Sequence, residues 1–169
     1  MDAADEQDFR EFVSARSAAL MRLGFLLTGG DQHAAEDLVQ AALAKLAAKW
    51  HRVNAPEAYV RQIMYRQQVS WWRTIGRRGE VVQAVPPDRP GKDHTHQSEL
   101  HMVLRGALAR LTPRQRAVLV LRYLEDLPED RVAEALGCSI GTVRSTTHRS
   151  LARLRQIAPE LATELEAAT

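Results

Sequence analysis

The sequence has little of several features that mark common classes of protein. It contains one cysteine, Cys138, which excludes an internal disulfide and a zinc site built from several cysteines. No run of residues is long and apolar enough to span a membrane. The first residues, MDAADEQDFREF, are acidic, whereas a secretory signal begins with basic residues. We therefore expect a cytoplasmic protein that has no contact with a membrane.

The chain also has little net charge and few runs of β-branched residues. The formal net charge is +2 over 169 residues, which excludes a polycation that coats DNA, so any contact with nucleic acid must come from local patches. Ala, Leu, Arg, Glu and Gln are abundant, and these residues favour helices. The sequence therefore predicts an all-α protein.

Helical periodicity is present in two parts of the chain, with an interruption between them. Before the interruption, apolar spacing predicts three helices. The first covers residues 9–27, the second starts after a cap at Asp31 and ends near Trp50, and the third covers residues 57–74. The interruption, RRGEVVQAVPPDRPGKDHTHQS, holds three prolines and two glycines and is typical of a linker. After it, the run LTPRQ predicts a helix start with Thr112 as the cap and Gln115 completing a capping box.

These boundaries predict two small helical domains. The first covers residues 1–77 and the second covers residues 99–158, with a flexible linker over residues 78–98 and a short acidic tail over residues 159–169. Each domain is near the lower size limit for a self-sufficient core. We therefore expect a partner surface to hold the two domains in a working arrangement.

A stretch near the end of the chain, PEDRVAEALGCSIGTVRSTTHRSL, has the spacing of a helix-turn-helix. Ala133 is small where two helices would cross, Gly137 tolerates the positive φ of a sharp turn, and Ser139 can cap the second helix. Residues 135–155 include four arginines, one histidine and no acid. The second helix of such a motif enters the major groove of duplex DNA, and the alternative is a helical hairpin with a basic, solvated face. On this helix we expect five residues to be buried: Ile140, Val143, Thr147, Leu151 and Leu154.

A second acid-free stretch, AYVRQIMYRQQVSWWRTIGRRG, covers residues 58–79 and interleaves aromatic residues with arginines. Unstacked bases lie on aromatic rings while the nucleic-acid backbone follows the positive charge, so this stretch is suited to opened, single-stranded DNA. The alternative is a core stripe, which we favour for Trp71, whereas Trp72 and Arg73 are better candidates for function. The loop before this stretch, HRVNAP, could form a pocket for one flipped base.

A duplex-reading motif at the end of the chain and an aromatic, basic helix before a proline-rich linker together resemble a group 4 sigma factor of bacterial RNA polymerase. These extracytoplasmic-function (ECF) sigma factors keep only sigma domains 2 and 4. The run FREFVSARSAALMRLGFLLTGG and the Trp-Trp-Arg ending are most similar to an actinobacterial subgroup labelled SigE-like. The resemblance covers nearly the whole chain. It implies a non-enzymatic factor that binds core RNA polymerase and directs promoter-specific initiation, with promoter DNA and, as a further candidate, an anti-sigma factor as partners.

The resemblance also implies roles for particular residues. HAAEDLVQAAL is similar to the domain 2 stretch that binds the clamp helices of the β′ subunit. It implies a polymerase contact by Asp37, Leu38 and Gln40. AYVRQIMYRQQVSWWR is similar to the segment that melts and reads the −10 element. With the preceding loop, it gives four candidates: Asn54, Arg61, Trp72 and Arg73. The segment from LTPRQ onward resembles domain 4, which reads the −35 element and docks on the β flap. It places the DNA contacts on Arg144, Ser145, His148 and Arg149.

Two other classes of protein remain as alternatives. A stand-alone helix-turn-helix regulator would need a dimer interface or a ligand pocket in the first domain, and operator binding without polymerase would favour it. An enzyme or metal protein could use HTHQSELH, which places His94, His96 and His101 close together, since a His-x-His pair can bind a metal. Histidines in a linker are far more often solvated. We therefore expect no metal site, no cofactor and no catalytic residue.

Overall fold

The computed structural model describes the backbone of residues 3–78 and 96–167 and their side chains, except those of residues 71–78, 96–101 and 164–165. Within these ranges the chain is helical and contains no strand, which confirms the predicted all-α class. The elements follow in the order α1 (Ala3–Leu27), α2 (Gln32–Ala47), η1 (Trp50–Arg52), α3 (Pro56–Arg78), α4 (His96–Ala109), α5 (Pro113–Leu119), η2 (Val120–Leu124), α6 (Glu129–Leu136), α7 (Ile140–Ile157) and α8 (Pro159–Ala167).

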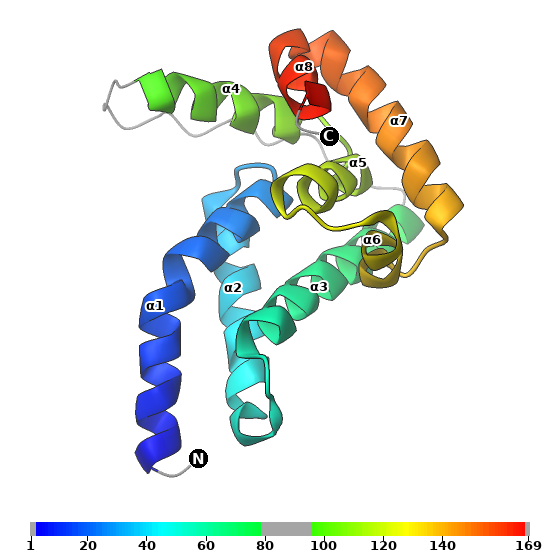
Figure 1. The fold of residues 1–169 in the computed structure, drawn as a ribbon. Helices are drawn as coiled ribbons and strands as arrows, with labels where there is room; N and C mark the ends of the chain where they lie inside the picture. Colours follow the sequence, from blue (N-terminus) through cyan, green and yellow to red (C-terminus); the bar gives the residue numbers. More distant parts are fainter. Residues whose placement is uncertain (1–2, 79–95, 168–169) are drawn as a thin grey trace.

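The first half of the chain is a bundle of α1, α2 and α3 (Figure 1). α1 buries Leu20, Leu23 and Leu27 at helical spacing, and it begins earlier than residue 9, where the apolar pattern starts. α2 follows Asp31, whose carboxylate accepts the backbone N–H of Ala34 at 3.0 Å, as the predicted cap requires. This bundle holds α3 along one side, so that the other sides of α3 are available to the rest of the chain.

In the second half, helix starts and turns follow the predicted capping residues. The Gln115 N–H donates to Thr112 Oγ1 at 3.2 Å, and the Thr112 N–H donates to the Gln115 side chain at 3.1 Å, which completes the capping box. α5 passes into the π-helical turn η2, in which the Glu125 N–H donates to the carbonyl of Val120 at 2.9 Å. The next residue, Asp126, has a left-handed φ of 51°. This turn sends the chain back toward the first half.

Of the segment expected as a short acidic tail, residues 159–169, the described part forms the helix α8 (Pro159–Ala167). Leu161 and Ala162 are 6% and 0% exposed, and they pack with Leu154 and Ala158 of the preceding segment in a small cluster. The acidic composition of this segment therefore does not indicate its packing, which depends on a few apolar positions within it. The second half of the chain therefore extends to residue 167.

The two halves pack against each other and share one hydrophobic core. α3 lies against α5 and α6, and α1 lies against α5 (Figure 1). The largest cluster of buried side chains joins Leu20 and Met64 of the first half with Leu121 and Val132 of the second. Each half alone is small, and closing their apolar faces on each other removes apolar surface from water. Of the predicted linker, the described residues at either end belong to α3 and α4, and residues 79–95 lie outside the described structure.

Candidate nucleic-acid interface

α6 and α7 form the predicted helix-turn-helix. Gly137 ends α6 with φ 61° and ψ 42°, a left-handed conformation that glycine adopts at little steric cost. Ser139 Oγ accepts the backbone N–H of Thr142 at 3.1 Å and so caps α7. Ala133 and Val143, 7% and 0% exposed, belong to the shared core. The sequence prediction of this motif is confirmed, and the turn fixes how α7 projects from the molecule.

The four residues expected to read duplex DNA lie on the solvent side of α7. Arg144, Ser145, His148 and Arg149 are all exposed. Arg144 Nε donates to Glu129 at 2.7 Å, which ties α7 to the first turn of α6. Arg149 Nε donates to the carbonyl of Ser145 at 3.2 Å, within its own helix. Both arginines can therefore turn toward DNA without uncovering the core, although Arg144 must first leave Glu129.

The buried side of α7 differs from the predicted one. Val143 and Leu154 are buried as predicted, but Ile140 is 41% exposed, and Thr147 and Leu151 are only half-buried. Thr146 and Ser150, which the prediction left out, are 3% and 0% exposed. The buried row is centred on positions 143, 150 and 154, which turns residue 146 inward and leaves residue 140 at its edge.

On α2, the residues expected to contact the polymerase are of two kinds. Asp37 and Gln40 are exposed and, being three residues apart, share a helix face. Leu38 is 8% exposed and belongs to the shared core, so its side chain does not reach a partner in this structure. Leu38 therefore belongs to the core of this structure, and Asp37 and Gln40 to the exposed face of α2.

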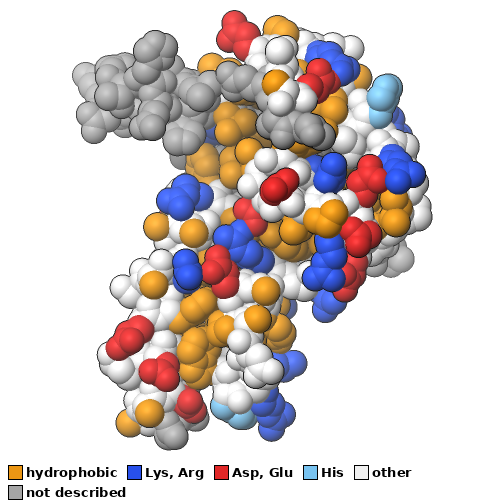
Figure 2. Space-filling model, in the orientation of Figure 1, with side chains coloured by type: hydrophobic (Ala, Val, Ile, Leu, Met, Phe, Trp, Pro, Cys, Tyr) orange, Lys and Arg blue, Asp and Glu red, His pale blue; other side chains and the backbone are white. Residues whose placement is uncertain are grey.

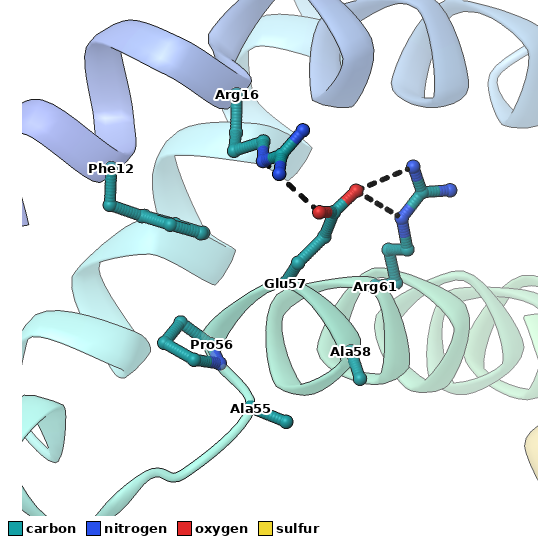
Figure 3. A pocket seen from close by; sticks show the side chains of 7 residues that line it. All are labelled: Phe12, Arg16, Ala55, Pro56, Glu57, Ala58 and Arg61. Carbon is teal, nitrogen blue, oxygen red and sulfur yellow. Dashed lines mark hydrogen bonds and ion pairs between the residues drawn. The ribbon is translucent and has the colours of Figure 1, made fainter.

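The loop before α3 borders an open cleft of about 560 Å³ (Figure 3). Its lining comes from α1, the end of the loop and the start of α3: Phe12, Arg16, Ala55, Pro56, Glu57, Ala58 and Arg61. Of the loop HRVNAP, only Ala55 and Pro56 border the cleft, and the base pocket expected there stays a prediction. Asn54 itself is exposed and is not among the lining residues.

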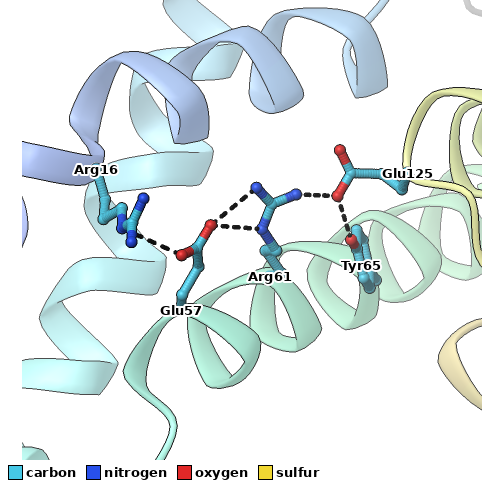
Figure 4. A network of polar contacts seen from close by, with 5 residues as sticks. All are labelled: Arg16, Glu57, Arg61, Tyr65 and Glu125. Atoms are coloured by element: carbon cyan, nitrogen blue, oxygen red, sulfur yellow. Dashed lines mark hydrogen bonds and ion pairs between the residues drawn. The ribbon is translucent and has the colours of Figure 1, made fainter.

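A chain of polar contacts crosses from α1 through α3 to the end of η2 (Figure 4). Arg16 Nε lies 3.1 Å from Glu57, and Arg61 Nη2 and Nε donate to Glu57 Oε1 at 3.0 and 3.3 Å. Arg61 Nη1 and the Tyr65 hydroxyl both donate to Glu125 Oε2, the hydroxyl at 3.1 Å. Figure 2 shows acidic and basic side chains alternating across the middle of this face. Arg61, a candidate for the −10 element, is therefore half-buried and held by two carboxylates.

The surroundings of Arg61 and Tyr65 keep both side chains protonated. Burial alone would lower the pKa of Arg61, but the hydrogen bonds and charge of Glu125 and Glu57 raise that pKa above its ordinary value. Burial raises the pKa of Tyr65, and the carboxylate of Glu125 raises it further. Both side chains are therefore hydrogen-bond donors at neutral pH.

Arg66 is a candidate that the sequence reasoning left out. It lies on α3, is exposed, and its side chain has no hydrogen bond or ion pair with any residue in the described part of the chain. It is therefore a freer cation on α3 than Arg61. The sequence does carry a signal for it, because Arg66 belongs to the same acid-free stretch, residues 58–79, as Arg61 and Arg73.

Arg116 is a buried arginine that no local sequence pattern indicates. It is 8% exposed, and its guanidinium donates to three backbone carbonyls: Leu108 at 3.0 Å, Leu111 at 3.2 Å and Leu27 at 3.3 Å. Burial lowers the pKa of Arg116 to about 10. The bond to Leu27 reaches the end of α1, so this side chain joins the two halves of the molecule.

Several remaining candidates are not tested by the described side chains. Trp72 and Arg73 belong to α3, but their side chains lie outside the described ones, as do those of His94, His96 and His101. Within the described residues, no group of three or more metal-ligating side chains is present. In the same part of the chain, no helix combines the length and apolar character needed to cross a membrane.

Comparison with known proteins relates the chain to transcription initiation factors. Residues 101–154 match the family described as Sigma-70, region 4. The chain is 39% identical over 152 residues to the RNA polymerase sigma-E factor of Streptomyces coelicolor, which covers 88% of this chain and 85% of that protein. It is 31% identical over 162 residues to the ECF RNA polymerase sigma factor SigE of Mycolicibacterium smegmatis, which covers 91% of this chain and 63% of that protein.

A solved structure shows the same fold over most of the chain. The sigma factor RpoE of Bartonella quintana, in complex with the anti-sigma factor NepR, superposes with a TM-score of 0.63 at 25% sequence identity. The match covers 89% of this chain and 96% of that one.

Proposed function

The chain belongs to the extracytoplasmic-function class of RNA polymerase sigma factors, and from this premise we propose how its residues bind core polymerase and read a promoter. As a sigma factor it acts with core RNA polymerase and promoter DNA to direct transcription initiation. The observation that carries the assignment of roles is the α6–α7 motif. It presents an exposed, acid-free row of side chains on a helix fixed by a left-handed turn, inside the segment that matches sigma region 4.

For the −35 element, we assign different tasks to the two arginines at the centre of α7. Arg144 is held toward the first turn of α6 by Glu129, and in helix-turn-helix proteins the first helix crosses the DNA backbone. We therefore assign Arg144 and His148 to the phosphates. Ser145 and Arg149 form the neighbouring i, i+4 row, and we assign Arg149 to a base edge in the major groove.

For the −10 element, we assign the melted strand to α3 and the loop before it. Asn54 is exposed in that loop, and Arg66 is an exposed cation on the helix. Trp72 and Arg73 are retained as the stacking and phosphate-binding pair, since aromatic rings beside arginines bind unstacked bases. Arg61 belongs to this set only when Glu125 no longer holds it.

The contact with the polymerase is assigned to the exposed face of α2, where Asp37 and Gln40 would meet the β′ clamp helices, and the second half would dock on the β flap. Held at a fixed separation by the enzyme, the second DNA contact becomes intramolecular, and avidity rises by about 10²–10⁴. We propose a cytoplasmic location and no catalytic step for this chain. The anti-sigma factor bound to the Bartonella relative supports the proposal that an inhibitory protein of this kind also binds here.

Selection of genomic DNA fragments with and without core polymerase tests this function against a stand-alone regulator. The protein and core polymerase together are expected to retain fragments that share two short elements at a fixed spacing. The protein alone is expected to retain none, because two small modules with a net charge of +2 bind DNA weakly. Selection of one specific sequence by the protein alone would instead favour the regulator.

A further inference from the structure

The place where the second half of the chain covers α3 is built like a site for an anion. One carboxylate oxygen, Glu125 Oε2, accepts from both Arg61 Nη1 and the Tyr65 hydroxyl. Guanidinium and tyrosine hydroxyl groups are among the donors with which proteins hold the phosphate oxygens of nucleic acids. The carboxylate of Glu125 therefore binds two donors, Arg61 and Tyr65, of the kind that bind the phosphates of DNA.

Arg61 is aimed at this place by its own helix. Its Nε and Nη2 are held by Glu57, one turn earlier on α3, and Nη1 is the nitrogen that points to Glu125 (Figure 4). Tyr65 lies one turn later on the same helix, and its hydroxyl points to the same oxygen. Because Glu57 also belongs to α3, the orientation of Arg61 does not depend on the second half of the chain.

The carboxylate, by contrast, comes from far along the sequence. Glu125 is 64 residues from Arg61 and follows η2. The Arg61 and Glu125 side chains are 25% and 16% exposed. A cleft of about 310 Å³ lies beside them between α3 and α6, with Gln62 and Arg131 in its lining. Side chains therefore fill only part of the space between α3 and α6. The donors Arg61 and Tyr65 are covered by the side chain of Glu125, which lies beside this cleft.

We propose that Glu125 occupies, in the free chain, the place that a backbone phosphate of the melted promoter strand takes on Arg61 and Tyr65. The second half of the chain and the DNA strand then compete for the same donors. Loss of the Glu125 contact would free these donors in part, and separation of the two halves on core polymerase would open α3 to the strand fully. This inference rests on the proposed function, because it assigns α3 to the melted strand.

Other contacts also hold the halves together, so removing the carboxylate is expected to weaken the closed arrangement without unfolding the protein. Arg116 donates to the carbonyl of Leu27 at 3.3 Å, and the Arg105 guanidinium lies 5.1 Å from the centre of the Phe25 ring. The apolar core shared by the two halves remains as well. The competition is therefore graded, and it can be measured as a change in affinity for single-stranded DNA.

The test is the binding of a fluorescein-labelled oligothymidylate to the full chain without polymerase, followed by fluorescence anisotropy. Glu125→Gln is expected to tighten binding by about tenfold, the order of effect of releasing one charge-assisted contact. Glu134→Gln is the matched control. It makes the same change in net charge beside the same cleft, but Glu134 pairs with Arg131 of its own helix at 2.9 Å. It is expected to change affinity by less than about twofold.

Two further variants separate competition from net charge and from misfolding. Glu125→Asp keeps the charge but is shorter by one methylene, so it is expected to release the donors in part and tighten binding by less than Glu125→Gln. In the double variant Arg61→Gln, Glu125→Gln the gain is expected to disappear, because the donor that the strand would use is gone. Equal tightening by Glu125→Gln and Glu134→Gln, or no tightening by either Glu125 variant, overturns the proposal.

Transcription with core polymerase distinguishes a failure of this inference from a failure of the proposed function. The wild-type protein and Glu125→Gln are expected to give equal transcript yields with core polymerase, since the halves are already apart there. If the wild-type holoenzyme initiates but Glu125→Gln binds oligothymidylate no better than wild type, only the competition is wrong. If the wild-type protein directs no initiation with core polymerase, the proposed function itself is wrong, and this inference with it.

Discussion

Gly29 stands where the two halves meet, and its replacement by alanine tests how they are joined. Its φ is 73°, in the left-handed region that favours glycine. A Cβ atom at this position would lie 2.6 Å from Cζ and 3.0 Å from Nη2 of Arg116. The Arg116 side chain is buried and donates to three carbonyls, so it cannot move into solvent to make room for a Cβ atom without losing these hydrogen bonds.

Two costs add in Gly29→Ala. A left-handed alanine costs about 1–2 kcal/mol. Displacing the Arg116 guanidinium from its carbonyls adds about 1–3 kcal/mol, because it leaves a buried charge short of acceptors. The free energy of unfolding is therefore expected to fall by about 2–5 kcal/mol.

Urea unfolding followed by circular dichroism measures this change. Gly106→Ala in α4 is the matched control: its Cβ would meet no described atom within 4 Å, so it is expected to be neutral or to stabilise by up to about 1 kcal/mol. In an Arg116→Ala background, Gly29→Ala is expected to cost only the backbone strain. If Gly29→Ala changes the free energy of unfolding no more than Gly106→Ala does, the packing of Arg116 against Gly29 does not hold the two halves together.

Four further substitutions test the polymerase contact, the cap of α7 and the reading of the −35 element. Asp37→Arg is expected to abolish co-purification with core polymerase at unchanged thermal stability, because an exposed charge swap costs the monomer little; full co-purification would refute the α2 contact. Ser139→Ala removes the acceptor of the Thr142 N–H and is expected to lower the free energy of unfolding by about 1 kcal/mol in urea; no loss would mean that the cap does not stabilise α7. The two arginines of α7 are compared on a library of promoters with randomised −35 elements at two salt concentrations. Arg149→Ala is expected to relax the preference at one base pair of the element and to cost about 1–3 kcal/mol of binding free energy. Arg144→Ala is expected to weaken binding to all promoters alike and to lower the slope of log affinity against log salt concentration by about one. An unchanged −35 preference in both would contradict direct readout by α7.

The features that the sequence predicts correctly are those decided by neighbouring residues. The Asp31 and Ser139 caps, the Thr112 capping box and the left-handed Gly137 are all present, because a cap or turn is settled within a few residues of the chain. The helix-turn-helix follows from these signals together with its spacing. The exposure of Arg144 and Arg149 agrees with the predicted solvent face of α7, whereas the buried face of this helix is predicted only in part.

What the sequence could not indicate depends on residues that meet only after folding. Glu125 and Arg61 are 64 residues apart, and no residue near either of them in the sequence indicates the contact, so the sequence does not predict that Arg61 is half-buried. The sequence around Arg116 is that of a surface arginine on a helix. Its side chain links the two halves only because folding places the carbonyl of Leu27 within hydrogen-bond distance of it. Leu38 is assigned to the polymerase contact by the resemblance alone, and its burial comes from the packing of α2 against α1 and α3.

Mapping of transcript start sites tests the central claim most directly. Core RNA polymerase is incubated with a pool of genomic DNA fragments, with and without this protein, and the 5′ ends of the transcripts are sequenced. We expect a set of start sites that appears only when the protein is present, each preceded by the same pair of −10 and −35 elements at a constant spacing. The same start sites with core polymerase alone, or no transcripts with the protein added, would contradict the assignment of this chain as a promoter-reading sigma factor.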